Sequence, residues 1–280
     1  MHHQQVESYN RANPPTKSKL AVPITVPHHV CLVGLNSTNP QRQAIGDLTL
    51  IGFYYLLRVG EYTYTPSTQR RRTQRFRVKD VVFRRADQTI IPNTASLAEL
   101  LQATHATLTI TNQKNGLKGQ CIHHHCTGVW TSPVKALARR VAHIMAHTHC
   151  TSTALSTYYV TGDACPKQIT PTHINSTIKA TVVTLGLHAY GITPSLVGTH
   201  SLRAGGAMAM ILNGVQPTVV KKMGRWSSNT WMNYIHEQID AITIGVAARM
   251  SRYIPFHNVL DNHIAPCISI PQEDSLNTPN

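Results

Sequence analysis

The sequence predicts an α+β fold, in which a mainly helical domain carries a small three-stranded antiparallel sheet. Helix starts are indicated where a capping residue is followed by proline and an apolar stripe, at Asn39-Pro40, Ser132-Pro133 and Thr170-Pro171. Strands are indicated by three short β-rich runs, and the last two flank Asn115-Gly116, a dipeptide typical of a tight hairpin turn. The length of 280 residues is enough for one large domain of this kind.

Each expected helix carries apolar residues at helical spacing. The expected helices run from Pro40 to Leu57, Pro133 to Met145, Pro171 to Leu185, His200 to Leu212, from Pro217 onward, and from about Asp240 to Arg249. The fourth of them contains Gly205 and Gly206, each of which costs roughly 1 kcal/mol relative to alanine in a helix. We therefore expect another element to pack closely against this helix.

The predicted strands are residues 78–84, 107–111 and 119–123. Residues 1–38 contain four prolines and little apolar periodicity, so we expect them to form a flexible, mostly unstructured arm. Residues 39–253 are expected to form the folded domain, and residues 254–280 a C-terminal tail.

The balance of charges favours a polyanionic partner. The chain has 26 Lys and Arg against 12 Asp and Glu, which gives a formal net charge of +14. The carboxylates are scattered along the sequence, whereas metal-dependent nucleases and transposases need clustered acids to hold their ions. Chemistry on nucleic acid would therefore depend on Arg, Lys, His and Tyr, and we expect no cofactor.

The cysteines and the apolar runs predict a soluble intracellular protein. Six cysteines at irregular spacing, without a secretory signal, are typical of reduced thiols. The longest strongly apolar run, from Leu48 to Leu57, is about half of the roughly 20 residues that span a bilayer. We expect no membrane contact, and a nuclear location if the source is eukaryotic.

A cluster of cysteine and histidine raises the alternative of a zinc site. Cys121 and Cys126 flank three histidines, and His143 and His147 follow at a spacing found in zinc fingers. On a helical wheel, however, His143 and His147 lie opposite the apolar stripe and should face solvent. The pattern therefore favours histidines that bind no metal, and a zinc site remains the alternative.

His200, Arg203 and Tyr234 are the groups that a metal-free phosphoryl transfer site needs. His200 and Arg203 are one helical turn apart near a helix start, so both can reach one anion, and the arginine fork binds two phosphate oxygens. A phenol attacks phosphorus only if its proton, with a pKa of about 10, is removed or cations stabilise the phenolate. The structural alternative is that His200 and Arg203 cap a core helix above a packed Tyr234.

Arg58 and Glu61 lie at the end of the first expected helix. A charged pair there is unfavourable unless it is paired or used. The structural alternative is a simple salt bridge between them at i, i+3 spacing.

Five arginines lie between residues 70 and 77. Such a run can be a solvated loop, a nuclear import signal, or a patch that grips a nucleic-acid backbone with an affinity that falls as salt rises. The sequence does not decide between these.

Together these motifs resemble the catalytic core of the tyrosine recombinase (phage integrase) family. Within that family the resemblance is to Cre-type enzymes, and to recombinases of mobile elements. The resemblance depends on Arg58 within Leu57-Arg58-Val59-Gly60-Glu61, on His200-x-x-Arg203, and on Tyr234, which stands 31 residues after Arg203. In Cre-type enzymes a tryptophan replaces the more usual histidine before the tyrosine. Trp226 fits this role but is eight residues before Tyr234, one closer than in Cre-type enzymes.

The resemblance implies roles for individual residues. The implied catalytic residues are Arg58, Lys114, His200, Arg203, Trp226 and Tyr234, with Glu61 in support. Arg58 and Arg203 would hold the non-bridging oxygens of a DNA phosphodiester while Tyr234 forms a 3′-phosphotyrosyl link. Lys114 on the hairpin, or Lys118 in its place, would protonate the leaving 5′ oxygen.

The resemblance also implies partners. These are double-stranded DNA and further copies of the chain, as a tetramer on DNA. The expected DNA contacts are Arg70, Arg71, Arg72, Arg75, Arg77, Lys118, Lys221, Lys222 and Arg225. The family usually has a helical DNA clamp before the catalytic domain, and we expect none within residues 1–38. Two alternatives remain open: a non-catalytic DNA-binding remnant of a mobile element, and a relaxase similar to type IB topoisomerases.

Overall fold

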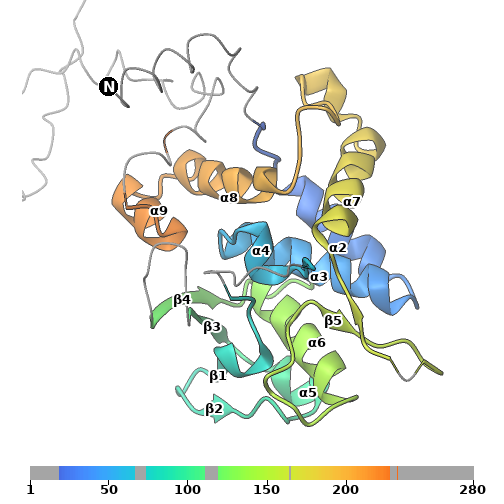
Figure 1. Ribbon diagram of the computed structural model, residues 1–280. Helices are drawn as coiled ribbons and strands as arrows, with labels where there is room; N and C mark the ends of the chain where they lie inside the picture. Colours follow the sequence, from blue (N-terminus) through green and yellow to red (C-terminus); the bar gives the residue numbers. More distant parts are fainter. Residues whose placement is uncertain (1–18, 67–73, 111–118, 164, 228–231, 233–280) are drawn as a thin grey trace, which may run out of the picture. The chain divides into compact units, whose positions relative to one another are not determined.

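The structure is a computed structural model that describes residues 19–66, 74–110, 119–163, 165–227 and 232. The helices are α2 (Thr25–Leu35), α3 (Pro40–Tyr54), α4 (Val59–Tyr62), α5 (Leu97–Leu100), α6 (Pro133–Met145), α7 (Pro171–Thr184), α8 (His200–Leu212) and α9 (Pro217–Gly224), with 3-10 turns η1 (Val78–Asp80) and η2 (Leu187–Tyr190). The strands are β1 (Val81–Arg84), β2 (Ile90–Ile91), β3 (His105–Ile110), β4 (Gln120–His125), β5 (Thr157–Tyr158) and β6 (Lys167–Gln168) (Figure 1). The α+β class is confirmed.

The main sheet has four strands in the order β2-β1-β3-β4, all antiparallel, so the prediction of three strands is wrong. The additional strand, β2, is two residues long and pairs with β1 after a turn in which Gln88 adopts φ 68°. A two-residue strand is too short to show alternation in the sequence. The predicted hairpin is present as the β3–β4 pair, with Ile110 opposite Gln120.

Helix α3 lies at the centre of the core. All of its residues from Ala44 to Phe53 are buried, and α2, α6 and α8 pack around it. It begins where the sequence predicts: Asn39 is the N-cap, and its side chain accepts a hydrogen bond of 2.8 Å from the backbone N–H of Gln41. The starts of α6, α7 and α9 at prolines are also confirmed.

Part of the predicted flexible arm is folded. Residues 25–35 form α2, which buries Val26 and Val30 against α3, so the prediction of an unstructured segment is wrong there. The prolines misled the sequence analysis because Pro23 precedes the helix and Pro27 lies in its first turn, where no intrahelical N–H bond is lost. The predicted helix over residues 240–249 and the tail lie outside the described residues.

The two glycines of α8 allow a close approach, as the sequence predicts. A Cβ atom on Gly205 would clash with the carbonyl oxygen of Val22, and one on Gly206 would clash with the carbonyl oxygen of Phe53. Helix α8 therefore lies directly against the end of α3 and the segment before α2. Among the helices that the structure describes, none has the length and apolar character to cross a bilayer.

Candidate functional site

The candidate site begins at the turn between α3 and α4. The sequence predicts one helix through this region, but α3 ends at Tyr54, and Leu56 takes a left-handed conformation with φ 49° that redirects the chain. Arg58 is then the N-cap of the short helix α4. Its backbone N–H donates to Oε2 of Glu61 at 2.8 Å, and its Nη1 lies 3.4 Å from Oε1. The Arg58–Glu61 ion pair, which the sequence offered as the structural alternative, is present, with the Arg58 side chain 27% exposed.

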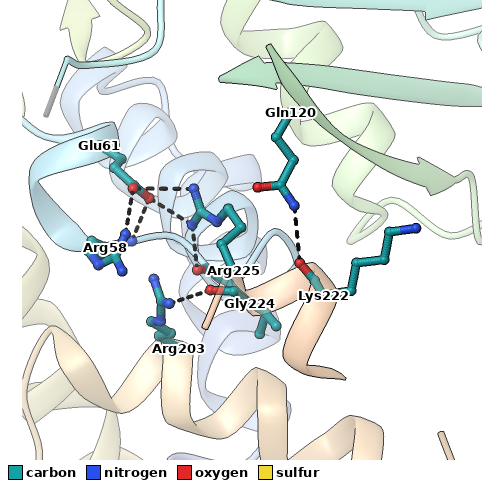
Figure 2. A network of polar contacts seen from close by, with 8 residues as sticks. Arg58, Glu61, Gln120, Arg203, Lys222, Gly224 and Arg225 are labelled. Carbon is teal, nitrogen blue, oxygen red and sulfur yellow. Dashed lines mark hydrogen bonds and ion pairs between the residues drawn. The ribbon is translucent and has the colours of Figure 1, made fainter. Parts of the chain in front are cut away.

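Glu61 has a second and closer charged partner, Arg225. Nη2 of Arg225 donates to Oε2 of Glu61 at 2.9 Å, and Nη1 donates to Oε1 at 3.2 Å (Figure 2). The Glu61 side chain is 2% exposed and that of Arg225 is 0% exposed. Removing two charges from water is strongly unfavourable unless the pair is close and further hydrogen-bonded, as it is here.

The conformation of Arg225 turns its side chain inward. Arg225 is the C-cap of α9 and has a left-handed backbone at φ 59° and ψ 43°. Its Nη2 also donates to the carbonyl oxygen of Leu56 at 3.0 Å. Burial lowers the pKa of Arg225, and the neighbouring carboxylate of Glu61 opposes this shift. The prediction that Arg225 contacts DNA is therefore wrong for this structure, because its guanidinium lies inside the protein.

Arg203 joins the same cluster from α8. It is 2% exposed, and its Nη2 donates to the carbonyl oxygen of Gly224, the residue before Arg225. Its guanidinium also lies 4.6 Å from the centroid of the Trp226 ring. Figure 2 shows the resulting series of contacts, from Arg58 through Glu61 and Arg225 to Gly224 and Arg203. The structure thus connects four of the residues that the sequence analysis named: Arg58, Glu61, Arg203 and Trp226.

His200 lies one turn before Arg203, at the first residue of α8, and its side chain is exposed. It borders a hollow of about 420 Å³ that is also lined by Lys19 and Lys179. These two cations make this part of the surface suitable for an anion.

Several predicted residues cannot be compared with the structure. Lys114, Lys118, Tyr234 and the arginines at 70, 71 and 72 lie outside the described residues. The segment with the two lysines connects β3 to β4, and Nε2 of Gln120 on β4 lies 3.4 Å from the carbonyl oxygen of Lys222 on α9. The sheet that carries the hairpin is therefore attached to the helix that ends at Gly224.

The other predicted DNA contacts lie at or near the surface. The guanidinium of Arg75 lies over the ring of Tyr64 at 4.7 Å, and Arg75 and Arg77 line a hollow of about 550 Å³. On α9, Lys222 is exposed and Lys221 is half-buried, and Figure 2 shows the Lys222 side chain directed away from the Glu61–Arg225 pair. Their contact with DNA stays a prediction.

The histidine-rich strand β4 makes contacts within the protein. His124 donates through Nε2 to the carbonyl oxygen of Tyr54 at 2.8 Å, and Nδ1 of His123 lies 2.8 Å from the hydroxyl of Thr107. Burial lowers the pKa of His124, which favours its neutral form. In the described part of the chain, no group of three or more His, Cys, Asp or Glu side chains is arranged to hold a metal ion.

His143 is half-buried, whereas the prediction was that it faces solvent. The backbone N–H of Tyr159 donates to Nε2 of His143 at 3.0 Å, because the segment after α6 folds back over this helix face. Burial lowers the pKa of His143 to about 4. His147, one turn further on, is exposed as predicted, and its ring stacks on that of Tyr159.

Arg225 was not identified from the sequence as a partner of Glu61. The sequence carried no signal for this pairing, because it depends on the left-handed conformations of Arg225 and Leu56, which neither residue type commonly adopts.

Comparison with known proteins identifies the fold. No family model and no curated protein matches the sequence. The XerH site-specific recombinase, in a post-cleavage complex with a palindromic difH substrate, matches with a TM-score of 0.50 and 12% identity over 84% of this chain and 54% of that one. XerA recombinase matches with a TM-score of 0.48 and 14% identity over 86% and 68% of the two chains. The Tn1549 transposon integrase matches with a TM-score of 0.41 and 13% identity over 86% of this chain and 67% of that one.

The likeness to XerH shows the fold. The chain spans about half the length of the XerH chain that it matches, 54%. The α+β fold that the motifs predict is therefore confirmed as the fold of this recombinase, with a four-stranded sheet in place of three strands.

Proposed function

Since the chain has the fold of the XerH site-specific recombinase, we propose that it cleaves and rejoins DNA strands through a 3′-phosphotyrosyl intermediate on Tyr234. The observation that carries this proposal is the common attachment of Arg58 and Arg203. The two residues come from α4 and α8, and both are fixed to one small cluster around Glu61 and the Gly224–Arg225 turn.

In the proposed reaction, Arg58 and Arg203 bind the non-bridging oxygens of one phosphodiester. Arg58 suits this role because its side chain is 27% exposed and its contact with Glu61, at 3.4 Å, is longer than that of Arg225. Negative charge on these oxygens grows in the transition state, and each preorganised donor is worth on the order of 3 kcal/mol. Trp226 packs on the guanidinium of Arg203 and helps to hold it in place.

The covalent step exchanges one phosphorus–oxygen bond for another. The phenolic oxygen of Tyr234 attacks phosphorus and the bond to the 5′ oxygen breaks, with His200 assisting removal of the phenolic proton. Lys114, or Lys118, gives a proton to the departing 5′ oxygen. A 5′ hydroxyl from a second strand reverses these events and reseals the backbone. The bond energy is kept in the phosphotyrosyl link, so neither a metal nor ATP is needed.

The proposed partners are double-stranded DNA and three further copies of the chain. An anionic polymer as ligand is supported by the net charge of +14 and by the exposed Lys222. It is also supported by the hollow beside His200, which Lys19 and Lys179 line. The Tn1549 integrase is described in complex with circular intermediate DNA. An exchange of four DNA strands requires four tyrosines, hence a tetramer.

A nicked duplex tests the proposal, because the short fragment released on cleavage diffuses away and traps the covalent adduct. Duplexes would be taken from the DNA that flanks the gene. We expect the wild-type chain to form a denaturation-resistant protein–DNA band, Tyr234→Phe to form none, and Tyr190→Phe to form as much as wild type, since Tyr190 is 80% exposed.

The other outcomes distinguish the alternatives. Salt-sensitive binding without an adduct would identify a non-catalytic DNA-binding protein. Relaxation of arbitrary supercoiled plasmid without strand exchange would identify a topoisomerase-like activity. An undiminished adduct in Tyr234→Phe would reject Tyr234 as the nucleophile.

A further inference from the structure

Arg225 occupies the point where three segments of the site meet. Its side chain reaches the carboxylate of Glu61 on α4 and the carbonyl oxygen of Leu56 in the preceding turn. The carbonyl of Gly224, in the peptide unit that leads into Arg225, accepts the hydrogen bond from Arg203. A change in the position of residue 225 would therefore shift the groups that hold both Arg58 and Arg203 (Figure 2).

The two residues joined by the hydrogen bond from Arg225 to the carbonyl of Leu56 both have an unusual backbone conformation. Within the described residues, the non-glycine residues with positive φ are Leu56, Gln88 and Arg225. Leu56 and Arg225 are hydrogen-bonded to each other, at 3.0 Å. Residues other than glycine adopt the left-handed conformation at a cost in free energy. Such residues concentrate at functional sites, where the surrounding contacts hold them in place.

The ion pair between Arg225 and Glu61 also affects which partner the side chain of Arg58 can bind. Arg225 binds Glu61 at 2.9 Å through Nη2, whereas the closest side-chain contact of Arg58 with Glu61 is 3.4 Å. Glu61 is nearly inaccessible to water, so without Arg225 its charge would be compensated only by Arg58. Arg58 would then be drawn toward the carboxylate and away from a phosphate.

We infer that Arg225 is a positioning residue of the proposed reaction: it neutralises Glu61 and fixes the Gly224 carbonyl, so that Arg58 and Arg203 are aligned on one phosphate, and it does not contact DNA itself. This inference rests on the proposed function. It differs from the role of a basic surface residue, because the Arg225 side chain is fully buried.

The first test separates positioning from DNA binding. With the full chain and nicked duplex at saturating concentration, Arg225→Gln should lower the cleavage rate about 100-fold, the effect of a small misplacement of a catalytic group. Its DNA affinity and the salt dependence of that affinity should stay at the wild-type values. Lys222→Gln, which removes an exposed charge from the same helix, should instead weaken binding and reduce the salt slope by about one.

A second buried arginine provides the control for a purely structural role. Arg140 is 1% exposed and donates to the carbonyl oxygens of Leu155 and Thr157, away from the candidate site. Arg140→Gln should lower thermal stability but leave the cleavage rate of the folded protein unchanged. Arg225→Lys keeps the charge that neutralises Glu61 and should recover part of the rate lost in Arg225→Gln.

A methylphosphonate at the scissile position gives a readout that a structural role would not change. This linkage lacks the negative charge that Arg58 and Arg203 would stabilise, so the rate loss in Arg225→Gln should be much smaller on it than on the phosphodiester. If Arg225→Gln does not fold, Glu61→Gln/Arg225→Gln, which removes both buried charges, would be compared with wild type on the same two substrates.

Three results would overturn the inference. These are a wild-type cleavage rate in Arg225→Gln or in the double variant, a loss of affinity and salt slope like that of Lys222→Gln, or an equal rate loss on both substrates. The absence of any adduct with the wild-type chain would instead reject the proposed function.

Discussion

Glu61 is the residue on which the geometry of the candidate site depends. Its carboxylate accepts hydrogen bonds from the backbone of Arg58 and from two nitrogens of Arg225 while it is almost completely shielded from water. A buried carboxylate in this position can hold two cationic segments together only as long as it keeps its charge. Loss of that charge leaves Arg225 buried without a counter-ion.

Replacement of Glu61 by glutamine should therefore affect both stability and catalysis. We expect Glu61→Gln to lower the free energy of unfolding by about 3 kcal/mol, because Arg225 loses its counter-ion. Denaturant unfolding would measure this change. The cleavage rate of the remaining folded protein should also fall, because Arg58 loses the carboxylate that orients it.

The Asp47–Arg139 pair provides a matched control outside the site. Arg139 donates to Asp47 through Nε at 2.8 Å, and its side chain keeps 13% exposure. Asp47→Asn should destabilise the fold by less than Glu61→Gln, since Arg139 can still reach water, and should not change the cleavage rate. Equal rate losses in the two variants would contradict a specific role of Glu61.

At the level of single residues, the sequence predicted the charges but not the way in which they pair. Arg58, Glu61, Arg203 and Trp226 were identified from motifs, and the structure connects them. Arg225 was assigned to DNA contact together with its neighbours Lys221 and Lys222. The assignment failed because α9 ends at Gly224, and the left-handed conformation of the next residue reverses the direction of its side chain.

Helix α8 places Arg203 against the end of α3. Gly206 lets its backbone approach the carbonyl of Phe53 and the side chain of Leu56, the residue whose carbonyl binds Arg225. Gly205 does the same beside Val22. The position of α8 is thus set by contacts with backbone, which cannot move aside as a flexible side chain can.

Alanine at Gly206 should disturb this contact. A Cβ atom there would overlap the carbonyl oxygen of Phe53, so we expect Gly206→Ala to destabilise the fold by about 1 to 3 kcal/mol, as overpacking does. Thermal unfolding would measure the effect. Gly60→Ala is the control, because a Cβ at Gly60 meets no atom within 4 Å, and its stability should be unchanged or higher by up to about 1 kcal/mol. A fully stable Gly206→Ala would show that α8 is free to shift.

The elements that the sequence predicted well are those with local signals. Capping residues followed by proline marked the starts of α3, α6 and α7, and the apolar stripes gave their buried faces. Helix α2 was missed because Pro23 and Pro27 were taken as signs of disorder, whereas Pro23 precedes the helix and Pro27 lies in its first turn. Strand β2 was missed because two residues carry no periodicity, and only pairing with β1 defines it.

At the scale of the whole molecule, the order of the motifs along the chain predicted the fold, and the likeness to XerH confirms it at 12% identity. Sequence could not predict that Arg225 would meet Glu61, because this pairing depends on the left-handed conformations of Leu56 and Arg225. The net charge of +14 is a property of the whole chain and supports a polyanionic substrate, but it does not identify which cations contact it.

The most direct measurement is the chemical identity of the residue joined to DNA. The trapped adduct from a nicked duplex would be digested with protease and nuclease, and the modified peptide sequenced by mass spectrometry. We predict a peptide that carries a nucleotide on the phenolic oxygen of Tyr234, linked through the 3′ phosphate, and formed equally in the presence of a metal chelator. A nucleotide on any other residue, or a reaction that the chelator abolishes, would contradict the proposed mechanism.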